Sequence, residues 1–118
     1  MLHKMNLWNS PFVCIKNGTK DIELRLNDEK RQAVSEGDVI EFTNVDTGEC
    51  LWVQVLEKTE YKDFHELYPN YEKSRMGYRE DEACHPHDME KYYPREKIEK
   101  YGVVAIRITL LPNGDGNE

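Results

Sequence analysis

The residues most suited to chemistry stand together in the segment 18–26, whose sequence is GTKDIELRL. It places an amine, a carboxylate and a guanidinium close together as Lys20, Glu23 and Arg25. Alternate residues of a strand share a face, so Glu23 and Arg25 lie on one face and the leucines on the other. Such a charged face suits a polar cleft whose ligand is rich in hydrogen-bond donors and acceptors. The alternative is a surface ion pair, which contributes about 0–1 kcal/mol.

A second segment with chemical potential is Cys84-His85-Pro86-His87, since cysteine and histidine are good zinc ligands. A structural zinc site uses four ligands, usually as two close pairs. The remaining histidines, His3 and His65, are far away in the sequence, and the chain has no Cys-x-x-Cys pair. We therefore expect no metal site and no cofactor.

Nucleophilic and phosphate-binding motifs are weak in this sequence. Cys14 follows the apolar rhythm of a helix, which is typical of a buried structural thiol. The seven glycines are scattered and do not form a phosphate-binding loop. Trp8 and Trp52 are candidates for stacking on a base, although packing against a helix is the commoner role.

One further arginine stands out because of its irregular surroundings. Arg75 and Tyr78 flank Gly77 in a Tyr- and Arg-rich segment, 68–79, that contains a proline. An arginine beside a glycine can reach over the mouth of a cleft, so both residues are candidate ligand-binding groups. The alternative is a solvated loop arginine.

The elements that must position these residues are short. Ser10-Pro11 begins a helix that Gly18 ends. Apolar alternation and turn residues predict strands over 21–26, 39–43, 50–58 and 103–111. Further helical segments are expected at 29–34, 63–67 and within the acidic stretch 80–101.

Short strands in this order, with short helices between them, favour a mixed α+β domain. Strands of this length bury most apolar surface by curling into a small, partly open barrel. A chain of 118 residues accommodates one domain. We assign it to residues 1–111 and expect the Gly/Asn/Asp-rich residues 112–118 to be a disordered tail.

Charge limits the partners that we expect. The net charge is −7, whereas the first 34 residues carry six basic and four acidic side chains. Tight binding of duplex nucleic acid needs a broad basic surface, so a nucleic-acid partner must be met locally or enter a pocket. The chain has no apolar run of membrane-spanning length and no secretory signal. With three widely spaced cysteines, these features favour a cytoplasmic protein with reduced thiols and no membrane partner.

Three motifs in order resemble the ASCH domain family, whose barrel is related to that of PUA domains. They are Gly18-x-Lys20-x-x-Glu23-x-Arg25, Glu36-Gly37-Asp38-x-Ile40-x-Phe42 and Tyr101-Gly102-Val-Val-Ala-Ile106. The resemblance implies a PUA-like mixed β-barrel flanked by short helices, with a cleft lined by the lysine, glutamate and arginine. It also implies a partner that is RNA or a nucleoside derived from it.

One branch of the family resembles an amidohydrolase that removes the acyl group from N4-acylated cytidine. Its signature has a threonine nucleophile where this chain has Glu23, while its lysine matches Lys20. A carboxylate cannot replace a hydroxyl that must be acylated. We therefore predict a binding module for single-stranded RNA, a nucleotide or a nucleoside, with Lys20, Glu23, Arg25, Arg75 and Tyr78 as ligand-binding residues. The alternative is a hydrolase of a modified nucleoside or of RNA in which Lys20 and Glu23 are catalytic through an altered mechanism.

Overall fold

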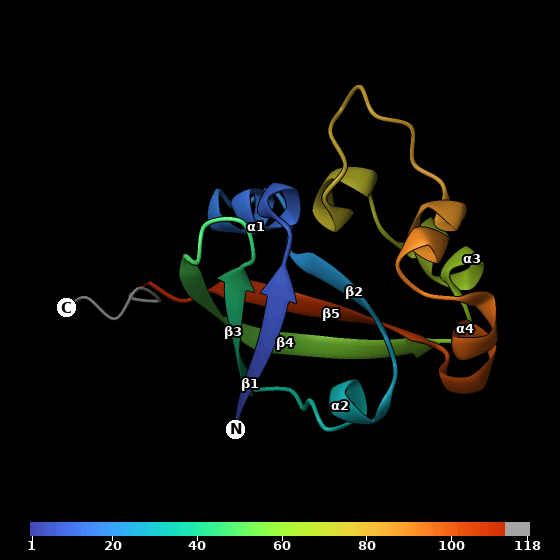
Figure 1. Ribbon diagram of the computed structural model, residues 1–118, viewed down its shortest axis with the longest axis horizontal. Coiled ribbons are helices and arrows are strands. Elements are labelled where there is room, and N and C mark those ends of the chain that lie inside the picture. Colours follow the sequence, from blue (N-terminus) through green and yellow to red (C-terminus); the bar gives the residue numbers. More distant parts are fainter. Residues whose placement is uncertain (113–118) are drawn as a thin grey trace.

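A computed structural model describes residues 1–112 and shows one mixed five-stranded sheet (Figure 1). Its strands are β1 (Leu2–Leu7), β2 (Ile22–Leu26), β3 (Val39–Asn44), β4 (Cys50–Tyr61) and β5 (Val103–Leu110). The strand order is β1-β3-β4-β5-β2. The β1–β3 pair is parallel and the other pairs are antiparallel, so the predicted mixed α+β architecture is confirmed.

The sheet curls into a half-barrel because β4 is long and irregular. Its first half pairs with both β3 and β5, and its second half continues along β5 past a bulge between Val55 and Glu57. A bulge bends a strand and increases its twist. In Figure 1, β1 and β3 accordingly run across the direction of β4 and β5. The curl brings the edge strands β1 and β2 together, and Arg25 Nη2 donates a hydrogen bond to the Asn6 carbonyl at 2.8 Å.

Strand β1 was not among the strands predicted from the sequence. It pairs with β3, and its buried residues are His3, Met5 and Leu7. The alternation is regular, but a histidine at the first buried position conceals it when only apolar residues are counted. His3 is accommodated because its Nε2 lies 2.8 Å from a carboxylate oxygen of Asp38, at the turn before β3.

The helices are short and lie around the sheet. They are α1 (Asn9–Lys16), α2 (Glu29–Gln32), α3 (Phe64–Leu67) and α4 (Arg95–Tyr101), with the 3₁₀ segments η1 (Tyr68–Asn70), η2 (Lys73–Met76) and η3 (Pro86–Lys91). Helix α1 begins at Asn9, so Ser10 lies inside the first turn and is not its cap.

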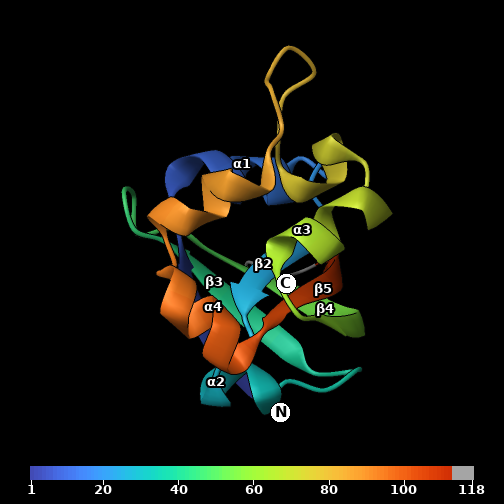
Figure 2. The ribbon, with the colours of Figure 1, turned by 90° about the vertical axis from the view of Figure 1, so that its right-hand side faces the viewer.

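The prediction that 80–101 is largely helical is wrong for its first part. Residues 79–85 form a loop that projects from the body of the protein in Figures 1 and 2, and helical structure begins only at Pro86. Three consecutive acidic residues, 80–82, repel one another and provide no apolar face that could dock on the core.

Two apolar clusters are buried on opposite faces of the sheet, and β5 contributes to both. The first lies inside the half-barrel against α1 and includes Val104, Ile106 and Ile108. The second packs β2 against α3, η1, η2 and α4, and includes Ile22, Leu24 and Leu26, as their spacing predicts.

Within residues 1–112, the structure has no helix with the length and apolarity that crossing a bilayer requires. Apart from Pro112, the tail predicted at 112–118 lies outside the described residues.

Candidate functional site

A pocket of about 730 Å³ opens where the edge strands β1 and β2 approach each other. Pockets of this size are typical of small-molecule sites. Its lining comes from the C-terminal end of β1, the start of α1, strand β2, the residues around η1 and η2, and segment η3. Lys20, Glu23 and Arg25 all belong to this lining, so the structure brings the three charged residues of the motif together in one cavity.

Glu23 lies inside the half-barrel although it is charged. It pairs with Ile106 of β5, and directly opposed residues of antiparallel strands share a face, so its side chain lies on the side of the inner apolar cluster. The residue is 3% exposed. Its Oε2 accepts a hydrogen bond from Arg25 Nε, and its Oε1 lies 3.4 Å from Lys20 Nζ. The carboxylate is thus held between two cations.

The Lys20 ammonium is held by two backbone carbonyls and one carboxylate. The residue is buried, and its Nζ donates to the Ile22 and Met76 carbonyls, each at 2.8 Å, in addition to its contact with Glu23. Burial lowers the pKa of Lys20, and the neighbouring carboxylate offsets this only in part. The lysine therefore joins β2 to η2 and orients Glu23.

The Glu23 carboxylate remains ionised. Burial alone would raise its pKa, but the adjacent Arg25 and Lys20 cations lower the pKa below the usual value for a glutamate. Burial would likewise lower the pKa of Arg25, yet Glu23 raises it. The pocket therefore contains a carboxylate that Arg25 and Lys20 hold in place and that can accept hydrogen bonds from a bound molecule.

Gly77 allows the Lys20 side chain to pass beneath η2. It ends η2 with a φ of 107°, in the left-handed region. A Cβ at this position would lie 3.1 Å from Lys20 Cδ and 3.6 Å from Nζ. A glycine is therefore required both by the backbone and by the packing of the lysine.

Gly77→Ala should destabilise the protein more than Gly37→Ala. Gly37 has a φ of 90°, and a Cβ there would meet nothing within 4 Å, so it carries the backbone cost of about 1–2 kcal/mol alone. At Gly77 the displacement of Lys20 adds to that cost. Urea unfolding of the two variants measures the difference, and equal losses would contradict the packing role of Gly77.

One wall of the pocket carries a chain of hydroxyl groups. The Tyr78 hydroxyl donates to Asp88 Oδ2 at 2.8 Å, and the Tyr68 and Tyr78 oxygens lie 2.7 Å apart. Because the Tyr78 proton is committed to Asp88, the Tyr68 hydroxyl donates to Tyr78. Burial raises the pKa of Tyr68 to about 12, and burial with these hydrogen bonds raises the pKa of Tyr78 as well. Both phenols are protonated at neutral pH.

The rim of the pocket carries two exposed aromatic residues. Trp8 follows β1 and is 59% exposed, and Tyr92 follows η3 and is 52% exposed. Trp8 is one of the candidates for base stacking in the sequence whereas Tyr92 is not, and only the three-dimensional arrangement places both beside the charged floor. Asp88 was also missed, because nothing in its local sequence connects it to Lys20 or Glu23.

Arg75 does not belong to the lining of this pocket. Its Nε and Nη2 donate to the two carboxylate oxygens of Asp21 at 2.8 and 2.9 Å, and its carbonyl accepts from the Asp21 amide. Both side chains are partly exposed. Arg75 thus connects η2 to the start of β2, and we do not retain it in the proposed site.

The half-barrel with a polar pocket at its seam defines a PUA-like architecture, and comparison with known proteins agrees with it. The model of the ASCH domain family matches residues 5–112. The chain belongs to the ASCH domain family. The curated proteins that were searched include no match to it.

Several solved structures share this fold. The hypothetical protein PH0355 is 31% identical, with a TM-score of 0.80, 94% of this chain and 100% of that chain being covered. The protein PF0455 from Pyrococcus furiosus is 33% identical, with a TM-score of 0.74 and coverage of 95% and 99%. A ZmASCH mutant protein from Zymomonas mobilis is 12% identical, with a TM-score of 0.66 and coverage of 94% and 71%, and this likeness concerns the fold alone.

Proposed function

We propose that the pocket binds a nucleobase, presented by a nucleoside, a nucleotide or a short single-stranded RNA segment. The observation that carries this proposal is the buried, ionised carboxylate of Glu23 on the floor of a pocket of about 730 Å³. Its Oε1 has only a 3.4 Å contact with Lys20, so lone pairs remain for a ligand. A carboxylate held in this way selects a ligand that donates hydrogen bonds.

The edge of a nucleobase supplies such donors. Exocyclic amino groups and ring N–H groups donate to carboxylates, as when glutamate or aspartate accepts from the amino group of cytosine. Cytosine and guanine carry an exocyclic amino group, whereas the ring N–H of uracil lies between two carbonyl oxygens that a carboxylate repels. We therefore expect Glu23 to favour the amino-bearing bases.

The aromatic residues of the rim provide the second part of the recognition. Trp8 and Tyr92 are exposed beside the floor, and stacking on an aromatic side chain contributes about 1–3 kcal/mol per base. Glu82 and Asp88 also line the pocket, with Lys91 as a further cation. This mixed charge, within a chain of net charge −7, suits a single base better than a long phosphate backbone.

Nuclear magnetic resonance titration tests the proposal. Cytidine, guanosine, uridine and a single-stranded RNA oligonucleotide are added separately to ¹⁵N-labelled protein. Saturable shifts should appear at the Trp8 indole and at the Gly77 and Glu23 amides, and uridine should bind more weakly than cytidine. Absence of shifts at these residues with every ligand would refute the proposal.

Trp8→Ala should weaken the binding of the base by about 1–3 kcal/mol, since it removes the stacking surface. Because Trp8 is exposed, the fold should persist. Trp52→Phe is the matched control: Trp52 is half-buried on β4, away from the pocket, and its substitution should leave the dissociation constant unchanged. Equal affinities of the two variants would contradict the stacking role.

The hydrolase alternative is tested by a separate experiment. Lys20 donates to the Ile22 and Met76 carbonyls and pairs with Glu23, which suits a positioning role better than proton transfer to a substrate. Incubation with N4-acylated cytidine, followed by chromatography, should give no cytidine. Its release at a rate that Glu23→Gln abolishes would replace the binding module by an enzyme.

A further inference from the structure

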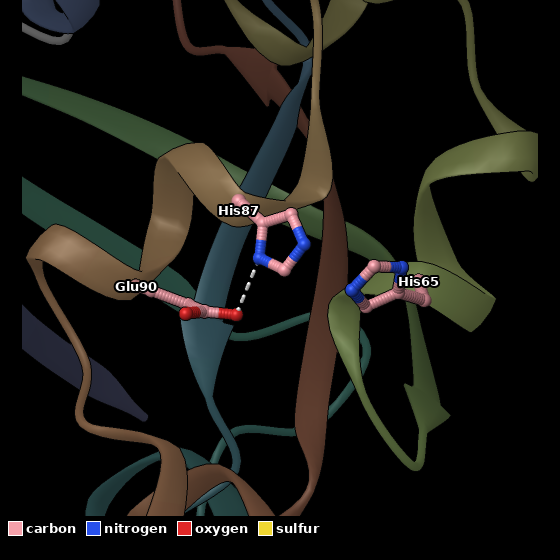
Figure 3. Close-up of side chains that lie close together, drawn as sticks. All are labelled: His65, His87 and Glu90. Carbon is pink, nitrogen blue, oxygen red and sulfur yellow. Dashed lines mark hydrogen bonds and ion pairs between the residues drawn. The ribbon is translucent and has the colours of Figure 1, made fainter.

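A second group of potential ligands lies on the protein surface, where α3 and η3 meet. His65 belongs to α3, whereas His87 and Glu90 belong to η3. Their ligand atoms all lie within 4.8 Å of one another, and Figure 3 shows the three side chains converging from the two elements. The sequence provides two of them as neighbours on one helical turn, but only the fold adds His65.

We propose that His65, His87 and Glu90 bind a divalent transition-metal ion, and that Zn²⁺ best fits this set. Two imidazoles and one carboxylate form a common ligand set of zinc sites that keep an open position for water. Imidazole is also a good ligand for Co²⁺ and Ni²⁺, whereas Mg²⁺ and Ca²⁺ prefer oxygen ligands alone. The expectation of no metal site set His65 aside because it is far from residues 84–87 in the sequence, whereas the fold places its ring centroid 4.9 Å from that of His87.

The present contacts are compatible with such a site after small side-chain rotations. His87 Nδ1 and Glu90 Oε2 lie 2.8 Å apart, and the dashed line in Figure 3 marks this contact. With metal–ligand bonds near 2.0–2.1 Å, ligand atoms of a tetrahedral site lie about 3.3 Å apart. The three groups must therefore move by about 1.5 Å or less. His65 and His87 are exposed, which permits this rotation and leaves an entry path.

Neighbouring residues hold η3 in position. His85 stacks on His87 with ring centroids 4.7 Å apart, and its Nδ1 accepts from the His87 amide at 3.1 Å. The His85 amide in turn donates to Asp88, which completes a capping box at the start of η3. Arg95 Nη2 lies 3.3 Å from Glu90 Oε2 and is the cation that the metal ion must compete with.

A bound metal ion would connect two short elements, α3 and η3. Segment η3 carries Asp88 in the pocket wall, and Tyr68 follows α3 directly. An ion bound by both elements would secure this wall to the body of the domain. The melting temperature should therefore rise with the concentration of Zn²⁺, because the ion binds the folded protein.

Isothermal titration calorimetry with ZnCl₂, on chelator-treated protein without a purification tag, tests this proposal. Binding should occur with one ion per chain. His65→Gln and His87→Gln should each weaken Zn²⁺ binding by more than about 100-fold. That exceeds the effect of about 10-fold to 100-fold that is usual for groups that only support a ligand. Replacing Zn²⁺ by CoCl₂ should give visible absorption bands that both variants lose.

Two control variants separate this site from other thiols and imidazoles. His85→Asn removes an imidazole that is not a proposed ligand but retains a side-chain acceptor for the His87 amide, so it should weaken Zn²⁺ binding less than either ligand variant does. Cys84→Ser removes the nearby free thiol and should also retain binding. Absence of binding to the parent protein would overturn the proposal. Binding that Cys84→Ser abolishes, or that both histidine-to-glutamine variants retain, would overturn it equally.

Discussion

Glu23→Gln should lower the free energy of unfolding by about 3–5 kcal/mol, the effect of removing one partner from a buried ion pair. The carboxylate lies between Lys20 and Arg25, which are themselves buried or nearly so. A neutral amide leaves these two cations without a counter-charge in a site that water does not reach freely. Urea unfolding at pH 7 measures the loss.

The same substitution in an exposed pair is the matched control. Glu57 pairs with Arg107 at 3.5 Å, and both side chains are about half exposed. Glu57→Gln should therefore cost only about 0–1 kcal/mol. A loss at Glu23 no greater than the loss at Glu57 would show that the three charged residues contribute little to the fold.

The deficit of Glu23→Gln should depend on pH in a definite direction. The folded-state pKa of Glu23 is below its ordinary value of 4.5. Its charge therefore contributes stability at pH values above 4.5, and this contribution is lost as the pH falls through the lower pKa of the folded state. The difference between parent and variant should be constant from pH 7 to about pH 5 and should shrink in more acidic solution. A deficit that grows on acidification would contradict the lowered pKa.

The sequence reveals the charged motif of residues 18–26 but does not show whether its charges are buried. The alternation of residues 22–26 predicts a strand with Glu23 and Arg25 on one face, and β2 confirms it. Whether that face meets solvent or the inside of a barrel depends on how far the whole sheet curls. The curl comes from the bulge in β4 and from the pairing of β1 with β3, which are distant in the sequence.

The rest of the pocket depends on long-range contacts in the same way. Tyr78 was identified because it stands beside a glycine, and it lines the pocket. Arg75 was identified by the same reasoning, yet its guanidinium pairs with Asp21. An arginine can satisfy itself with any carboxylate within reach, and the local sequence does not show which carboxylate the fold brings near. Trp8 and Asp88 are far apart in the sequence, and only the fold brings both to the pocket.

Gly102 explains the Tyr-Gly pair that precedes the last strand of the motif. Its φ of 73° and ψ of −172° lie in a region that is essentially restricted to glycine. Its amide donates to the Ile98 carbonyl at the end of α4, and its carbonyl accepts from the Asn27 amide after β2. A Cβ at this position would lie 2.9 Å from the Tyr61 carbonyl oxygen at the end of β4. One glycine therefore allows α4, β2 and β4 to meet at the start of β5.

Gly102→Ala should destabilise the protein by about 3 kcal/mol or more, since backbone strain of about 1–3 kcal/mol adds to an overpacking cost of similar size. The carbonyl of Tyr61 belongs to a paired strand and cannot move aside as a flexible side chain would. Gly48→Ala is the control, because Gly48 has a φ of 81° and a Cβ there would meet nothing within 4 Å. Urea unfolding should place Gly102→Ala well below Gly48→Ala in stability. Similar stabilities of the two variants would mean that the end of β4 can move away from residue 102 without cost. Gly102 would then be needed only for its positive φ between α4 and β5.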